Sequence, residues 1–141
     1  MTKQQLMTED EIHDFGVEVV FGQLKKDGYE ILSVNTDRTM NPQIVAKKDG
    51  ERAFIVVRTA CYPNKGVMES EELAFKMIDH ADKNGAICYF ASVGIVNAEG
   101  QNDEEMSRPV KGAGFQVSYE GLLTLTLSNR VKVLGEPSDD T

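Results

Sequence analysis

Hydrophobic residues in the first part of the chain recur with the spacing of an amphipathic helix. Thr8 is followed three residues later by Glu11, which is the pattern of a capping box at a helix start. Gly28 follows the last apolar residues and is a natural stop signal. The pattern therefore predicts a first helix over residues 8–26.

This first helix carries apolar residues around more than half of its circumference, which is wider than packing on one sheet face requires. The arc divides into two stripes, namely Ile12, Phe15 and Val19, and then Val17, Val20, Phe21 and Leu24. Two explanations follow. Either another part of the same domain covers the second stripe, or the stripe contacts a second copy of the chain in a homodimer.

Strand patterns follow the helix at residues 29–35, 43–48 and 51–60. The last two are separated by Asp49-Gly50, a dipeptide that strongly favours a two-residue hairpin turn. The strand at 51–60 is apolar on both faces, as in a strand at the centre of a sheet with a layer on each side. We therefore expect an antiparallel meander whose third strand is central.

A second helix is predicted from Ser70, its N-cap, to residue 83. The next strand, over 86–96, is again apolar on both faces. Because a helix connects the third and fourth strands, these two strands should be parallel, with a right-handed crossover.

The C-terminal third has weaker patterns. Residues 97–114 are polar and rich in glycine, with a short helical turn expected at 103–107. Residues 115–127 look extended, and "RVKVL" (130–134) is either a further strand or a packed tail. We expect one domain over residues 1–134, of mixed α/β or α+β class with helices on the sheet faces, and a disordered acidic tail at 135–141.

Composition and charge narrow the functional classes. The 141 residues are 40% hydrophobic and 27% charged, as in an ordinary globular domain. The net charge of -8 disfavours nonspecific binding to nucleic acid, because a phosphate backbone is held mainly by Lys and Arg. A protein partner or self-association is therefore favoured over nucleic acid.

The expected location is the cytoplasm. No apolar run approaches the length of a membrane span, and the N-terminus lacks the apolar segment of a signal peptide. Cys61 and Cys88 have no metal-type spacing, so we expect reduced thiols that pack as small hydrophobic groups.

The order of helix, three antiparallel strands, helix and parallel strand, with its Asp49-Gly50 hairpin, resembles the common core of the PD-(D/E)XK nuclease superfamily, the restriction-endonuclease-like fold. The resemblance covers about residues 8–96. It implies an active site on the hairpin. There, an acid that opens the second strand and an acid in the third bind Mg²⁺, an acid of the first helix often joins them, and a Lys stabilises charge on the phosphate.

Alignment by the turn places Gln43 and Val56 at the positions of the two strand acids and Arg58 at that of the Lys. Glu18 is the best match to the acid of the first helix. Val56 offers no metal ligand, and Gln43 offers only an amide oxygen. The resemblance therefore implies a vestigial site without catalytic residues, metal or other cofactor.

An alternative keeps the activity through relocated acids. Asp37 precedes the second strand and is the acid best placed to reach the Gln43 end of the hairpin. Together with Glu18 it would hold Mg²⁺ in a divergent nuclease. Asp49 and Glu51 lie at the far end of the hairpin.

A cluster of polar residues is expected near the end of the third strand, where Arg58, Cys61 and Lys65 are candidates for ligand binding. A thiol enzyme would need Arg58 or Lys65 to lower the pKa of Cys61. It would also need a base, and only His13 and His80 are present. Both fall on predicted helices, where we expect surface or partly buried side chains.

The sequence thus favours a catalytically inactive, nuclease-like domain that acts as a binding or interaction module. The two alternatives are the Mg²⁺-dependent nuclease and an acidic interaction protein of a mobile-element or defence system, whose anionic face binds a basic partner.

Overall fold

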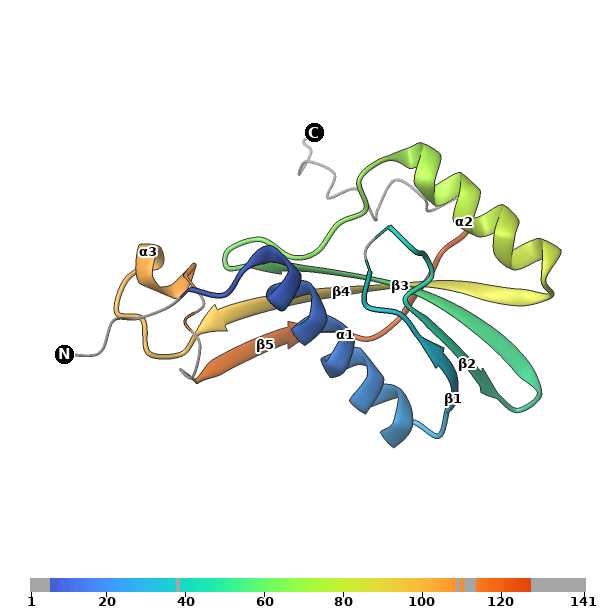
Figure 1. The fold of residues 1–141 in the computed structure, drawn as a ribbon, viewed down its shortest axis with the longest axis horizontal. Helices are drawn as coiled ribbons and strands as arrows, with labels where there is room; N and C mark the ends of the chain where they lie inside the picture. The colour runs from blue at the N-terminus through green and yellow to red at the C-terminus, as the bar shows by residue number, and fades with distance from the viewer. Residues whose placement is uncertain (1–5, 38, 109, 111–113, 128–141) are drawn as a thin grey trace.

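The computed structural model describes residues 6–37, 39–108, 110 and 114–127. Figure 1 shows the arrangement of its helices and strands. In chain order these are α1 (Glu9–Lys26), β1 (Glu30–Val34), β2 (Ile44–Lys48), β3 (Glu51–Cys61), α2 (Glu71–Lys83), β4 (Ala86–Asn97), α3 (Asp103–Met106), β5 (Phe115–Tyr119) and β6 (Leu123–Thr124).

The strands form one mixed sheet in the order β1-β2-β3-β4-β5. β1, β2 and β3 are antiparallel neighbours, and β3 and β4 form the parallel pair from Arg52–Ala86 to Cys61–Ile95. β4 also pairs antiparallel with β5 through residues 93–97, and with β6 through Tyr89 and Phe90. The predicted antiparallel meander followed by a parallel strand is confirmed, and so is the mixed α+β class.

Two hydrophobic cores lie on opposite faces of the sheet, because successive side chains of β3 point to opposite sides. On one face, Ile55 and Val57 pack in the core that contains buried residues of α1. On the other, Phe54 and Val56 pack in the core that contains buried residues of α2. The two helices lie apart in Figure 1, and β3 is covered on both sides as expected.

Local signals set the helix starts. The Thr8 hydroxyl accepts a hydrogen bond from the backbone N–H of Glu11 at 3.2 Å, and the Glu11 carboxylate accepts one from the N–H of Thr8 at 2.8 Å. The Ser70 hydroxyl accepts a hydrogen bond from the N–H of Leu73 at 3.1 Å. Both predicted N-caps are therefore confirmed.

The second apolar stripe of α1 is covered within the same chain. Val17, Val20 and Leu24 are buried in the core, and Phe21 packs against it. Phe15 lies edge-on to Phe115 of β5, with 5.5 Å between ring centroids. Among the described residues, no large apolar side chain of α1 is exposed.

The described C-terminal part contains the elements that the sequence predicts there. The helical turn is present as α3, and the extended segment divides into β5 and β6 on either side of Gly121, whose φ is +103°. "RVKVL" and the acidic tail at 135–141 lie outside the described residues. Within the described part of the chain, no helix is long and apolar enough to cross a membrane.

Candidate functional site

The site begins where β2 and β3 separate. Their pairing runs from the Asp49-Gly50 turn to the pair Ile44–Ile55. The N–H of Gln43 still donates to the carbonyl of Ile55 at 3.1 Å. β3 continues to Cys61 and remains paired with β4, so this last part of β3 has an edge that β2 does not cover.

The side chain of Gln43 closes the end of the hairpin. It is 1% exposed, and its Oε1 accepts hydrogen bonds from the N–H of Val57 at 2.8 Å and from Nη1 of Arg58 at 3.3 Å. Its Nε2 donates to Oδ1 of Asn41 at 2.9 Å and to the carbonyl of Asp37 at 3.2 Å. The amide therefore satisfies the Val57 N–H, which points to the uncovered edge, and orients Arg58.

Arg58 is a buried cation, and its contacts include Gln43, Val57 and Glu69. Its Nη1 donates to the carbonyl of Val57 at 2.9 Å as well as to Gln43. Its other edge faces the carboxylate of Glu69, with Nε–Oε2 at 2.9 Å and Nη2–Oε1 at 3.0 Å. Paired hydrogen bonds of this kind are the strongest contacts that a guanidinium makes with a carboxylate. Gln43, Arg58 and Glu69 thus form one network.

The four positions that the nuclease resemblance singled out do not form one cluster. Gln43 and Arg58 are in contact. Val56 is 0% exposed in the core beside α2. Glu18 is exposed on α1, the helix that packs on the opposite face from Val56. Glu69 contacts Arg58 where Glu18 does not, and sequence reasoning missed it because an acid in a loop carries no pattern.

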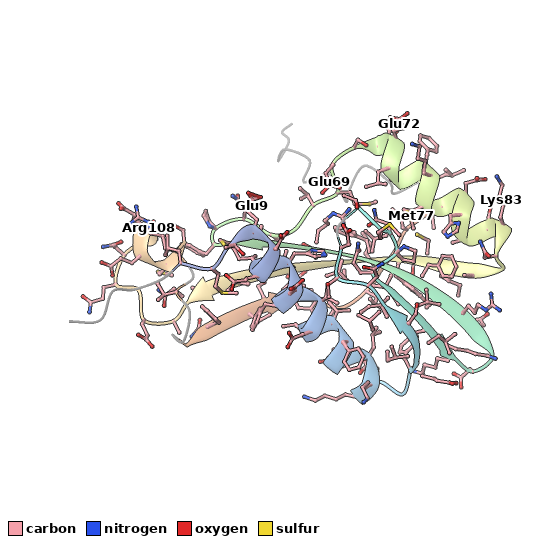
Figure 2. The ribbon with its side chains drawn as sticks, viewed as in Figure 1. Glu9, Glu69, Glu72, Met77, Lys83 and Arg108 are labelled. Carbon is pink, nitrogen blue, oxygen red and sulfur yellow. The ribbon has the colours of Figure 1, made fainter. Side chains whose placement is uncertain are left out.

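A cleft of about 700 Å³ lies beside the uncovered edge of β3. The first turns of α1 form one wall and the loop over 62–69 forms another. Figure 2 labels the two acids of the lining, Glu9 on α1 and Glu69 at the end of the loop. The three predicted binding residues, Arg58, Cys61 and Lys65, all line this cleft.

Two glycines bring the walls close to β3. A Cβ at Gly16 of α1 would overlap Oγ1 of Thr59, and a Cβ at Gly66 of the loop would overlap the carbonyl of Arg58. The Ser92 hydroxyl also donates to the carbonyl of Gly66 at 2.6 Å, which fixes the loop over β4. Helix and loop can approach β3 this closely because neither position carries a side chain.

The two histidines differ in their exposure to solvent. His80 is exposed, as expected. His13 is 3% exposed and lines the cleft, which corrects our expectation of a surface or partly buried side chain. The signal was present in the sequence, because His13 lies one turn before the buried Val17 on the same helix face.

The environment of Cys61 does not activate its thiol. Burial raises the pKa of Cys61 above its ordinary value, which lowers the fraction of reactive thiolate. The neighbouring cations are paired with acids, Arg58 with Glu69 and Lys65 with Glu120 at 3.2 Å. The thiol-enzyme alternative required a lowered pKa, so the geometry opposes it.

The acids of the alternative metal site lie elsewhere. Asp37 lines a separate surface depression with Asp10 and Asp14, and its Oδ1 accepts hydrogen bonds from the N–H and hydroxyl of Thr39 at 2.9 and 2.7 Å. Glu18 does not line that depression. Among the residues that the structure describes, no three His, Cys, Asp or Glu side chains form a group that could hold a metal ion.

Comparison with known proteins identifies a family whose description names no activity. A search of curated proteins finds no match to the chain. A family model described as a domain of unknown function, DUF8840, matches residues 10–125. The matched region includes the whole Gln43–Arg58–Glu69 network and both walls of the cleft except Glu9. The chain belongs to the DUF8840 family.

Proposed function

We propose that this protein is a restriction-endonuclease-like domain that binds a ligand in the cleft beside β3 and does not cleave nucleic acid. The observed order of helix, antiparallel strands, crossover helix and parallel strand supports the fold assignment. The position of the cleft, where β2 and β3 separate, supports the placement of the site.

The Gln43–Arg58–Glu69 network is the observation that carries the proposal. Mg²⁺ needs several oxygen ligands in near-octahedral geometry. The Gln43 oxygen already accepts two hydrogen bonds, and one of them comes from the Arg58 cation at 3.3 Å. A divalent cation at this oxygen would be repelled by the guanidinium, and Val56 adds no ligand.

The cleft has the properties of a binding site. Its volume of about 700 Å³ lies within the range of roughly 300 to 1,000 Å³ that is typical of small-molecule pockets. Apolar and charged side chains line it together, with Ile12 and Val67 among the former and Arg58 and Lys65 among the latter. Such a surface can hold the body of a ligand and fix its orientation.

Titration calorimetry with Mg²⁺ and Mn²⁺, combined with a cleavage assay on single- and double-stranded DNA and RNA, tests this function. We expect no saturable metal binding and no cleavage. Saturable Mg²⁺ binding that is lost in Glu18→Ala or Asp37→Asn would contradict the proposal. It would support the divergent nuclease with relocated carboxylates instead.

One observation favours the acidic interaction protein as a second candidate. Asp10, Asp14 and Asp37 line the same depression, on a chain whose net charge is -8. A basic partner would be attracted to such a face, with an affinity that falls as salt rises. Salt-sensitive binding of a cationic protein that Asp10→Asn and Asp14→Asn weaken would support this candidate.

A further inference from the structure

The Arg58–Glu69 ion pair joins two side chains of very different exposure. The Arg58 side chain is 5% exposed and that of Glu69 is 59% exposed. A buried guanidinium needs an anion beside it, because an uncompensated buried charge is strongly destabilising. An exposed carboxylate has water as an alternative partner. Arg58 therefore needs an anion more than Glu69 needs Arg58.

The backbone on both sides of Glu69 is anchored. Met68 is 2% exposed in the core beside α2, and Ser70 caps that helix. Rotation about the side-chain bonds of Glu69 can therefore move the carboxylate away from Arg58 without unfolding the loop or α2.

We propose that the cleft is a receptor for a small-molecule monocarboxylate, and that Glu69 occupies the Arg58 guanidinium until such a ligand displaces it. This inference rests on the proposed binding function and names its ligand class. The Glu69 carboxylate shows the required chemistry, because its two oxygens lie 2.9 and 3.0 Å from Nε and Nη2. A ligand carboxylate can form the same paired hydrogen bonds.

The other residues that line the cleft favour a particular ligand body and ligand charge. Ile12, Pro63 and Val67 also line the cleft, and Val67 is 41% exposed, so an apolar ligand body of modest size has surface to cover. The first turn of α1 carries Glu9, Asp10 and Glu11, which already offset the positive end of the helix dipole, so the charge that attracts the ligand is that of Arg58. Glu9 lines the cleft and opposes a second negative charge on the ligand, so a monocarboxylate is favoured over a doubly charged phosphate.

Calorimetric titration with benzoate tests the displacement. Glu69→Gln removes the competing carboxylate and should bind benzoate at least fivefold more tightly than the wild type. Glu72→Gln is the matched control, because Glu72 is an exposed acid on the first turn of α2 and outside the cleft, and its affinity should equal that of the wild type (Figure 2). Equal affinities of Glu69→Gln and wild type would overturn the proposal.

The Nε–Hε NMR signal of Arg58 in the wild type locates the binding and does not depend on the folding of a variant. It should shift progressively as benzoate is added and stay in place with benzyl alcohol, which has the ring without the carboxylate. Inorganic phosphate should bind more weakly than benzoate. An unmoved Arg58 signal at saturating benzoate, or tighter binding of phosphate, would overturn the inference.

The two proposals fail in different ways. Absence of benzoate binding to Glu69→Gln, with no cleavage in the nuclease assay, would overturn the carboxylate receptor and leave the non-cleaving domain intact. Metal-dependent cleavage would overturn the non-cleaving domain, whatever the benzoate titration gives.

Discussion

The Gln43 side chain continues the pairing that the backbone of β2 makes with β3 up to the pair Ile44–Ile55. Its Oε1 takes the place of a strand carbonyl opposite the N–H of Val57, and the same oxygen helps to hold Arg58. A buried donor that loses its acceptor costs about 1–3 kcal/mol, and more when the donor is charged. At the residue scale, the amide is therefore a structural group that also orients the candidate site.

Replacement of this amide by an apolar group of similar size tests its structural role. We expect Gln43→Met to lower the free energy of unfolding by about 2–4 kcal/mol, because Val57 and Arg58 lose a shared acceptor. Gln116→Met on the exposed face of β5 is the control and should stay within about 0.5 kcal/mol of the wild type. Urea unfolding measures both, and equal losses would argue against the role.

Cys88 gives a prediction for the pH dependence of stability. Burial raises its pKa to about 12, whereas an unfolded thiol titrates near roughly 8.5. Since the folded pKa is the higher one, this stabilisation is complete below about pH 8.5 and is lost as the pH rises toward 12. The unfolded state binds fewer protons in that window, so stability should fall by about 1.4 kcal/mol per pH unit.

Urea unfolding at pH 8, 9 and 10 measures this slope. Cys88→Ala should reduce the decline between pH 8.5 and 10, whatever its effect on stability at pH 8, and the raised pKa of Cys61 should leave part of the decline. Burial also raises the pKa of Tyr119 to about 12, so a second decline that Cys88→Ala does not remove is expected above about pH 10. An unchanged slope in Cys88→Ala would contradict the assignment to this thiol.

At the element scale, local signals made much of the fold predictable. The Thr8–Glu11 capping box, the Ser70 cap and the Asp49-Gly50 turn each act within four residues, and all are present. The partner of Arg58 was not predictable, because Glu69 reaches it through loop geometry that no sequence period reports. The burial of His13, in contrast, was indicated by its place one turn before Val17 on the same face of α1, and sequence reasoning missed that signal.

The contact between α1 and β3 gives a matched pair of substitutions on one helix. Gly16→Ala places a methyl group against Thr59, so α1 must shift, and we expect a loss of about 1–3 kcal/mol. A Cβ at Gly22 meets nothing within 4 Å, so Gly22→Ala should gain up to about 1 kcal/mol from helix propensity. Thermal or urea unfolding of both variants gives the comparison, and changes of the same sign would contradict it.

At the scale of the whole molecule, the sheet is covered by α1 on one face and by α2 on the other. The sequence predicted this layering from the two-sided apolar pattern of β3. It could not decide what covers the second stripe of α1, because the strand residues that bury Val17, Val20 and Leu24 come later in the chain and only the folded sheet brings them together. The second stripe is therefore part of the core of the chain itself.

Phe15 lies on the other, half-buried stripe of α1, and Phe15→Ala tests whether that side of the helix contributes to stability or to self-association. We expect it to lower the free energy of unfolding by about 1–3 kcal/mol, because a half-buried aromatic contact is lost. The sedimentation coefficient at micromolar concentration should stay that of a single chain for both wild type and variant. A wild-type dimer that Phe15→Ala converts to a monomer would instead support the homodimer through the first helix.

The close approaches at Gly16 and Gly66 have a consequence for ligand size. At both positions the backbone lies too close to β3 for a Cβ atom to fit. The two glycines therefore set how far each wall of the cleft stands from β3, and so the width of the cleft. A relative with alanine at either position would have to hold a wider cleft with the same charged groups. Size selectivity could therefore diverge within the family while Gln43, Arg58 and Glu69 stay unchanged.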